Sequence, residues 1–135
     1  MTEHTSAAGN VKLVCREDCG NAPRKKLLLE WNVALVNGDF DFLLRHVTDT
    51  VVWDRVGVGN IQGKDRLIET LESFKEHPIT ELRIDHIITH GYTAALHGMM
   101  TYGGKRRRFC DVYVFNGASK QAKIKEITTY AIEES

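Results

Sequence analysis

The sequence predicts an α+β fold in which helices cover one face of a curved antiparallel sheet. Two observations support this prediction. The first half of the chain has three stretches with apolar residues at helical spacing, interrupted by one strand-like run around Trp53. The second half has four strand-like runs joined by glycine-containing turns. Helical segments followed by a series of strands are typical of α+β folds.

The first helix is expected over residues 24–37, since Pro23 suits a first turn and Gly38 suits a C-terminal end. Its leucines, Trp31 and Ala34 would form a buried stripe, while polar residues such as Asn32 would take the other side. A second, short helix would follow Asp39, a residue type that caps helix N-termini well.

A third helix is expected around Leu67–Phe74, ending before Pro78. The strands complete the order α-α-β-α-β-β-β-β. They are expected at residues 51–56, 80–90, 93–102, 105–115 and 122–132.

Length and composition fit one domain. The chain has 135 residues, of which 42% are hydrophobic and 27% charged, enough for one core that needs no disulfide or metal. We expect residues 1–22 to form an N-terminal arm, loose up to about residue 10, and residues 23–135 to form the domain. The 18 basic and 18 acidic residues cancel, which argues against nucleic acid or a membrane surface as the main partner.

The cysteines and the N-terminal residues predict a cytoplasmic protein. Cys15, Cys19 and Cys110 are an odd number, and no apolar leader precedes them. Cys15 and Cys19 lack the C-x-x-C spacing of zinc and redox sites, so we interpret them as an incidental pair. No stretch is long and apolar enough to span a membrane.

Common motifs for phosphate and metal binding are not met. Glycines 57, 59 and 63 fit neither the dinucleotide nor the Walker spacing. His86 and His90 share one strand face, and a metal would need a third ligand such as His97; we expect hydrogen-bonded strand histidines and no metal. The basic run 105–108 alternates between two strand faces, so it predicts no nucleic-acid patch.

Two aspartates lie within apolar strands. Asp54 alternates with two valines, and Asp111 alternates with Phe109, Tyr113 and Phe115. Both faces of the strand around Asp111 are apolar, so its second face must be buried against a pocket, a partner chain or the curled sheet. Burial raises the pKa of a carboxyl group, which suits proton transfer near neutral pH. The alternative is a structural aspartate, bonded to the backbone or to an arginine, or exposed at a strand end.

Four segments together resemble the superfamily of nuclear transport factor two and ketosteroid isomerase, in particular its SnoaL-like bacterial members. They are WNVALVNGD at 31–39, WDRVG at 53–57, IQGKD at 61–65 and DVYVFNG at 111–117. The resemblance covers about residues 23–133. It implies a cone: a strongly bent sheet wrapped around a central pocket that helices close.

The resemblance also implies roles for particular residues. Asp54 falls on the base of the isomerase, and Asp111 on its hydrogen-bonding acid. Trp31 stands where the isomerase has its oxyanion tyrosine, and Phe109 stands where the epoxide-hydrolase branch has an arginine. Trp31, His97, Phe109 and Tyr113 are the expected ligand-binding residues.

The sequence thus predicts a domain that binds a small apolar or aromatic molecule. One alternative is an acid/base enzyme of ketosteroid-isomerase or polyketide-cyclase type that acts on an apolar carbonyl compound. The other is a non-catalytic module for ligand or protein binding. We expect no cofactor, no nucleic-acid or membrane partner, and a homodimer formed through the sheet.

Overall fold

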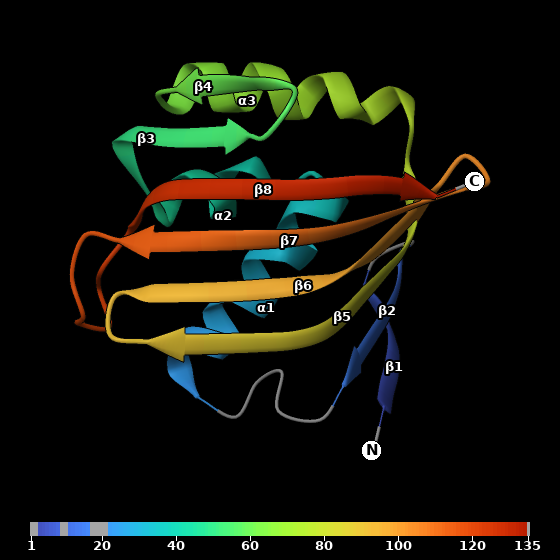
Figure 1. Ribbon diagram of the computed structural model, residues 1–135, viewed down its shortest axis with the longest axis horizontal. Helices are drawn as coiled ribbons and strands as arrows, with labels where there is room; N and C mark the ends of the chain where they lie inside the picture. The colour runs from blue at the N-terminus through green and yellow to red at the C-terminus, as the bar shows by residue number, and fades with distance from the viewer. Residues whose placement is uncertain (1–2, 9–10, 17–21, 135) are drawn as a thin grey trace.

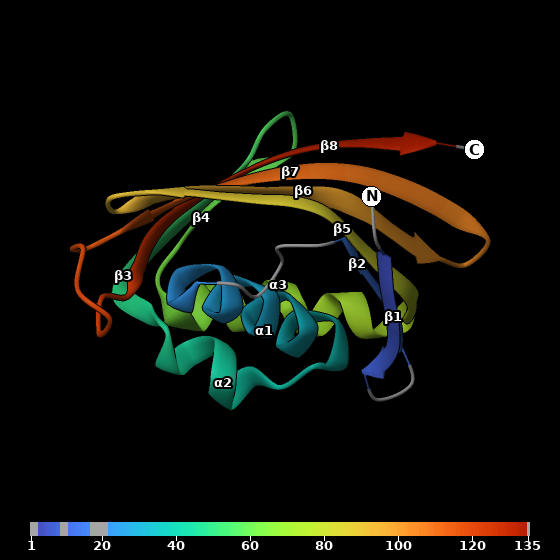
Figure 2. The ribbon, with the colours of Figure 1, turned by 90° about the horizontal axis from the view of Figure 1, so that it is seen from below.

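The computed structural model describes residues 3–8, 11–16 and 22–134. Within them, an eight-stranded sheet arches over three helices (Figures 1 and 2). The helices are α1 (Pro23–Asn37), α2 (Phe40–Arg45) and α3 (Lys64–Ser73), with a short 3-10 helix, η1 (Phe74–Glu76), after α3. The strands are β1 (Glu3–Ala8), β2 (Val11–Arg16), β3 (Val47–Arg55), β4 (Gly59–Gln62), β5 (Ile79–His90), β6 (Thr93–Tyr102), β7 (Lys105–Phe115) and β8 (Ile124–Glu134). The predicted α+β class is confirmed.

The strand order across the sheet is β1-β2-β5-β6-β7-β8-β3-β4. Strands β5 to β8 form the expected antiparallel meander. Two neighbouring pairs are parallel, β2 with β5 and β3 with β8. The pairing of β3 with β8 brings the first predicted strand against the last, which places the residues around Trp53 beside those around Thr129.

The N-terminal arm differs from the expectation of a loose tail. Glu3–Ala8 pairs with β2, and β2 extends the sheet beside β5 (Figure 1). Cys15 in β2 is disulfide-bonded, whereas the sequence suggested an incidental pair in a reducing compartment. Cys19 lies outside the described residues, and Cys110 is a free thiol. No helix in the described part of the chain is long and apolar enough to cross a membrane.

The helix boundaries follow the predicted signals. Pro23 is the first residue of α1, and Gly38 ends it with a φ of 74°, in the left-handed region that favours glycine. Asp39 caps α2 by accepting a hydrogen bond from the amide of Phe42. One expectation for α1 is wrong: Asn32 is buried rather than on the polar side.

An irregularity in β5 reverses which residues face the core. The pairing with β6 shifts register between Ile84 and His86, so Ile84 is buried while Ile88 is exposed. At this shift Gly98 of β6 lies against β5, and a Cβ on Gly98 would be only 1.9 Å from the carbonyl oxygen of Arg83. A glycine is therefore required where the two strands approach most closely.

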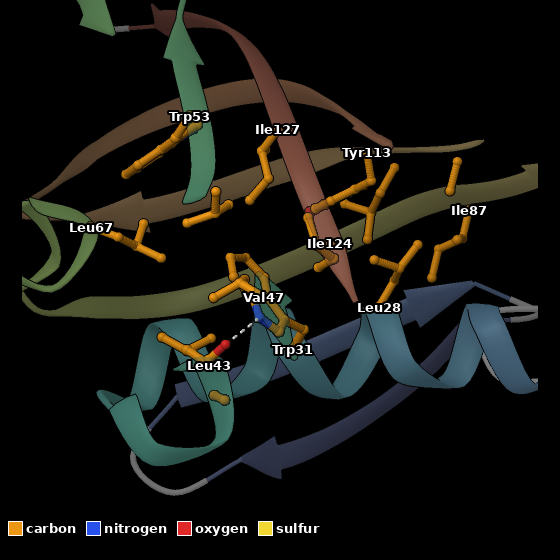
Figure 3. Packing of buried hydrophobic residues seen from close by; sticks show 14 of the residues in the cluster. Leu28, Trp31, Leu43, Val47, Trp53, Leu67, Ile87, Tyr113, Ile124 and Ile127 are labelled. Carbon is orange, nitrogen blue, oxygen red and sulfur yellow. Dashed lines mark hydrogen bonds between the residues drawn. The ribbon is translucent and has the colours of Figure 1, made fainter. Parts of the chain in front are cut away.

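The core lies between the concave face of the sheet and the helices. Figure 3 shows Leu28 and Trp31 of α1 directed toward Tyr113 and Ile124 of the sheet. The indole nitrogen of Trp31 donates to the carbonyl oxygen of Leu43, which ties α1 to α2 (Figure 3). This packing holds α1 against the sheet and positions its residues Trp31, Asn32 and Leu35.

Candidate functional site

A cavity of about 460 Å³ lies between the concave face of the sheet and the helices α1 and α3. Most of its walls are apolar, and eight of the lining residues have polar side chains. The aromatic and aliphatic lining includes Trp31, Leu35, Trp53, Leu67, Leu71, Phe74, Met100, Phe109 and Ile127. The polar lining consists of Asn32, Arg55, His77, Tyr102, Arg107, Asp111, Thr129 and Glu133. Such a cavity has the size and composition of a small-molecule site.

Asp111 is the buried carboxyl group of this cavity, with 8% of its surface exposed. Its Oδ1 accepts a hydrogen bond of 2.6 Å from the hydroxyl of Thr129 on the neighbouring strand β8. Its Oδ2 accepts one of 3.0 Å from the hydroxyl of Tyr113, two residues along β7 on the same face. Both carboxylate oxygens are thus held by the protein while the group still borders the cavity.

Two further side chains fix the direction of these hydrogen bonds. The indole nitrogen of Trp53 donates to Thr129 Oγ1 at 2.9 Å, so the Thr129 hydroxyl is free to donate to Asp111. The Asn32 amide nitrogen donates to the hydroxyl oxygen of Tyr113 at 3.1 Å and to the carbonyl oxygen of Leu28 at 2.9 Å. A carbonyl oxygen only accepts, so this second bond fixes which end of the Asn32 amide carries nitrogen. Both series of hydrogen bonds, from Trp53 through Thr129 and from Asn32 through Tyr113, end at Asp111.

Burial dominates the titration of Asp111. Loss of solvation raises its pKa from 3.8 to about 6, and the hydrogen bonds from Thr129 and Tyr113 offset part of that rise because they favour the charged form. A carboxyl group with a pKa near 6 exists in both forms close to neutral pH. Burial, and then the neighbouring Asp111 charge, raise the pKa of the Tyr113 phenol well above its ordinary value, so Tyr113 stays a neutral donor.

The predicted ligand-binding residues fall in different places. Trp31 and Phe109 line the cavity, and their contact with a ligand stays a prediction. Tyr113 is fully buried behind Asp111 and does not line the cavity. His97 is exposed, and its Nε2 lies 2.8 Å from Nδ1 of His86, with the two rings stacked. His97 therefore faces away from the cavity, as do His86 and Cys110, its partners in register on the two neighbouring strands.

The expectation that Asp54 and Asp111 share one cavity is wrong. Trp53 and Arg55 line the cavity, and Asp54, which lies between them on β3, does not. Side chains alternate between the two faces of a strand, so Asp54 lies on the outer face of the sheet. The register agrees: Arg55 pairs with Thr129, which pairs with Asp111, whereas Asp54 pairs with the neighbouring Thr128. Asp54 cannot act as a base on a molecule held beside Asp111.

The polar residues of the site that the sequence did not indicate include Asn32, Arg55 and Thr129. Asn32 lies four residues after the buried Leu28, so helical spacing could have placed it on the buried face. Strand alternation places Arg55 on the same face as Trp53, but the sequence did not show that this face is the inner one. Thr129 gave no signal of its own, because its role depends on the pairing of β8 with β7 and β3.

Solved structures with the same fold come from several bacteria. An NTF-2 like protein of unknown function from Burkholderia xenovorans superposes with a TM-score of 0.70 at 18% identity, covering 84% of this chain and 85% of the other. A candidate SnoaL-like polyketide cyclase from Shewanella denitrificans gives 0.68 at 14% identity, covering 80% and 89%. An LEH-like epoxide hydrolase from M. tuberculosis gives 0.62 at 23% identity, covering 79% and 80%.

Identities this low show that the proteins share a fold, and they carry no conclusion about a shared activity. No curated protein matches the sequence. The SnoaL-like domain family matches residues 28–127, which is well over half of the chain. The match begins within α1, includes the strands β3 to β7, and ends at the fourth residue of β8. The chain therefore belongs to the SnoaL-like family, and it has the cone-shaped fold of the NTF2-like structures.

Proposed function

We propose that the chain binds a small, mainly apolar molecule in the cavity and exchanges a hydrogen bond or a proton with it through Asp111. The observation that carries the proposal is a single buried carboxyl group with a pKa of about 6 at the wall of a mainly apolar cavity. The molecule would present an oxygen, such as a carbonyl, to that group. Such an oxygen would offset the part of the cost of burial that the hydrogen bonds from Thr129 and Tyr113 leave.

The hydrogen-bond directions support this role for Asp111. Thr129 and Tyr113 are the donors in their hydrogen bonds to Asp111. The proton of a neutral Asp111 is therefore not used in either bond. That proton is then available to an acceptor in the cavity. A ligand carbonyl oxygen would take the hydrogen bond when Asp111 is protonated, and a ligand C–H or O–H acid would meet a base when Asp111 is ionised.

The more specific proposal is acid/base catalysis by Asp111 alone. The alternative is ligand binding without catalysis. With Asp54 on the outer face, a reaction that needs two carboxyl groups in the cavity is not proposed. A single group that takes a proton from one substrate atom and delivers it to another is compatible with isomerisation of a carbonyl compound, and with dehydration when the receiving atom is the oxygen of the leaving hydroxyl.

Ligand binding is tested with an apolar fluorescent probe, N-phenyl-1-naphthylamine, and two neighbouring methionines. Met100 lines the cavity and Met99 does not, although both are partly buried on β6. We expect Met100→Trp to fill the cavity and abolish the probe's fluorescence gain, while Met99→Trp retains it. Equal loss in both variants, or no gain with the wild-type chain, would overturn the proposal.

The homodimer is proposed on the outer face of the sheet. Several large apolar side chains are exposed there on three strands. They are Ile88, Val112, Tyr130 and Ile132. Exposed apolar side chains gathered on one sheet face favour association with a second surface of the same kind. A second copy of this chain supplies that surface.

A further inference from the structure

Arg55 is a cavity-lining cation with no ion pair and an unsatisfied Nε among the described residues. Its Nε is buried without a hydrogen bond, and none of the ion pairs found in the described part of the chain includes it. The guanidinium carbon lies 5.4 Å from the ring centre of Trp53. Its Nη2 lies near Gly59 of β4, since a Cβ added there would be 3.9 Å from that nitrogen.

Asp111 does not neutralise this cation. The two residues are separated by Thr129 of the intervening strand, so their Cα atoms are about 10 Å apart across the sheet. Both oxygens of Asp111 accept from other donors. At the far end of the cavity, Arg107 and Glu133 face each other in register, so that cation has a carboxylate beside it.

A half-buried guanidinium without a counter-charge is unfavourable, because its lost hydration is not replaced. A carboxylate would replace it with two parallel hydrogen bonds, for which the planar fork of arginine is suited. Trp53 and Phe109 line the same cavity as Arg55 and would contact an apolar ring. The inner face thus offers a cation, an apolar wall and a hydrogen-bonding acid in one cavity.

We propose that the cavity selects small carboxylic acids with an apolar, ring-containing body, whose carboxylate binds Arg55 while an oxygen elsewhere in the molecule approaches Asp111. This inference rests on the proposed function, since it names the class of molecule for the same cavity. It adds a specificity-determining residue, Arg55, that is separate from the proposed acid.

The test compares two molecules with the same ring system, 2-naphthoate and methyl 2-naphthoate, by isothermal titration calorimetry at pH 7. We expect the wild-type chain to bind the acid about tenfold more tightly than the ester. In Arg55→Gln this preference should fall to about one, while the affinity for the ester changes by less than about twofold, because only the charged contact is removed.

Two further variants make the result specific. Arg107→Gln removes a cavity-lining cation that already faces a carboxylate and should keep the preference for the acid. Arg55→Lys keeps the charge but loses the planar guanidinium, so it should keep only part of the preference for the acid. This variant tests the role of Arg55 if Arg55→Gln does not fold. Equal binding of acid and ester to the wild-type chain, or a preference that survives in Arg55→Gln, overturns this inference and leaves ligand binding intact. Binding of neither molecule overturns both proposals.

Discussion

The phenol of Tyr113 donates its hydrogen bond to Asp111 within the buried face of one strand, with 3.0 Å between the two oxygens. Neither group would be stable in this place alone. The buried phenol needs an acceptor, and the carboxyl group needs donors that offset its lost hydration. Asn32 completes the arrangement by donating to the phenol oxygen from α1. The acid of the cavity is therefore held by a helix and two strands together.

Asp111 should make the stability of the chain depend on pH. Because its folded pKa of about 6 is above the ordinary value of 3.8, the folded chain binds this proton more tightly than the unfolded chain. The resulting stabilisation is fully present below about pH 4 and is lost as pH rises through about 6, a change of about 3 kcal/mol. Urea unfolding of the wild type and Asp111→Asn from pH 4 to 8 measures it. The same pH dependence in both chains would contradict the raised pKa.

The two donors to Asp111 should lower its pKa separately. Removing either hydroxyl takes away a bond that favours the charged form, so the pKa should rise above about 6 in Thr129→Val and in Tyr113→Phe. The rise should be larger in Thr129→Val, since its bond of 2.6 Å is shorter than the 3.0 Å bond from Tyr113. Carbon-13 NMR titration of the Asp111 carboxyl carbon follows each value. A pKa that falls in either variant would show that the hydroxyl does not donate to the carboxylate.

A methyl group on Gly98 should force β5 and β6 apart. In Gly98→Ala the new carbon would meet the Arg83 carbonyl oxygen at 1.9 Å, and both atoms belong to the paired strands rather than to flexible side-chain ends. We expect a loss of about 2 kcal/mol or more in the free energy of unfolding, as for other overpacked sites. Gly117→Ala is the matched control, because nothing lies within 4 Å of its added Cβ. Equal urea midpoints for the two variants would refute the close approach.

The proposed dimer should depend on the outer face of the sheet. Val112→Asp places a charge among the exposed apolar residues of that face, where burial against a second copy would be costly. We expect a monomer by light scattering where the wild type is a dimer. Val58→Asp changes an exposed valine in the turn between β3 and β4 and should remain dimeric. Dimerisation that is unaffected by Val112→Asp would place the interface elsewhere.

Local patterns in the sequence predicted most of the elements, because helix ends and the turns between strands are determined by residues close together in the sequence. Pro23, Gly38 and Asp39 act at the ends of α1 and α2 as expected. The short strand β4 was missed, since four residues between glycines carry little signal. The β5 register shift was missed as well, because it depends on contact with Gly98 of another strand.

For the site, the sequence by itself determined that Asp111 shares a face with Phe109 and Tyr113, and that Asp54 lies opposite Trp53 and Arg55, because strand alternation is a local property. It could not determine which face of β3 is the inner one. The tertiary structure decided this through the pairing of β3 with β8, which aligns Arg55 with Thr129 and Asp111. The curvature of the sheet then encloses that aligned row beneath the helices, and it leaves Asp54 outside.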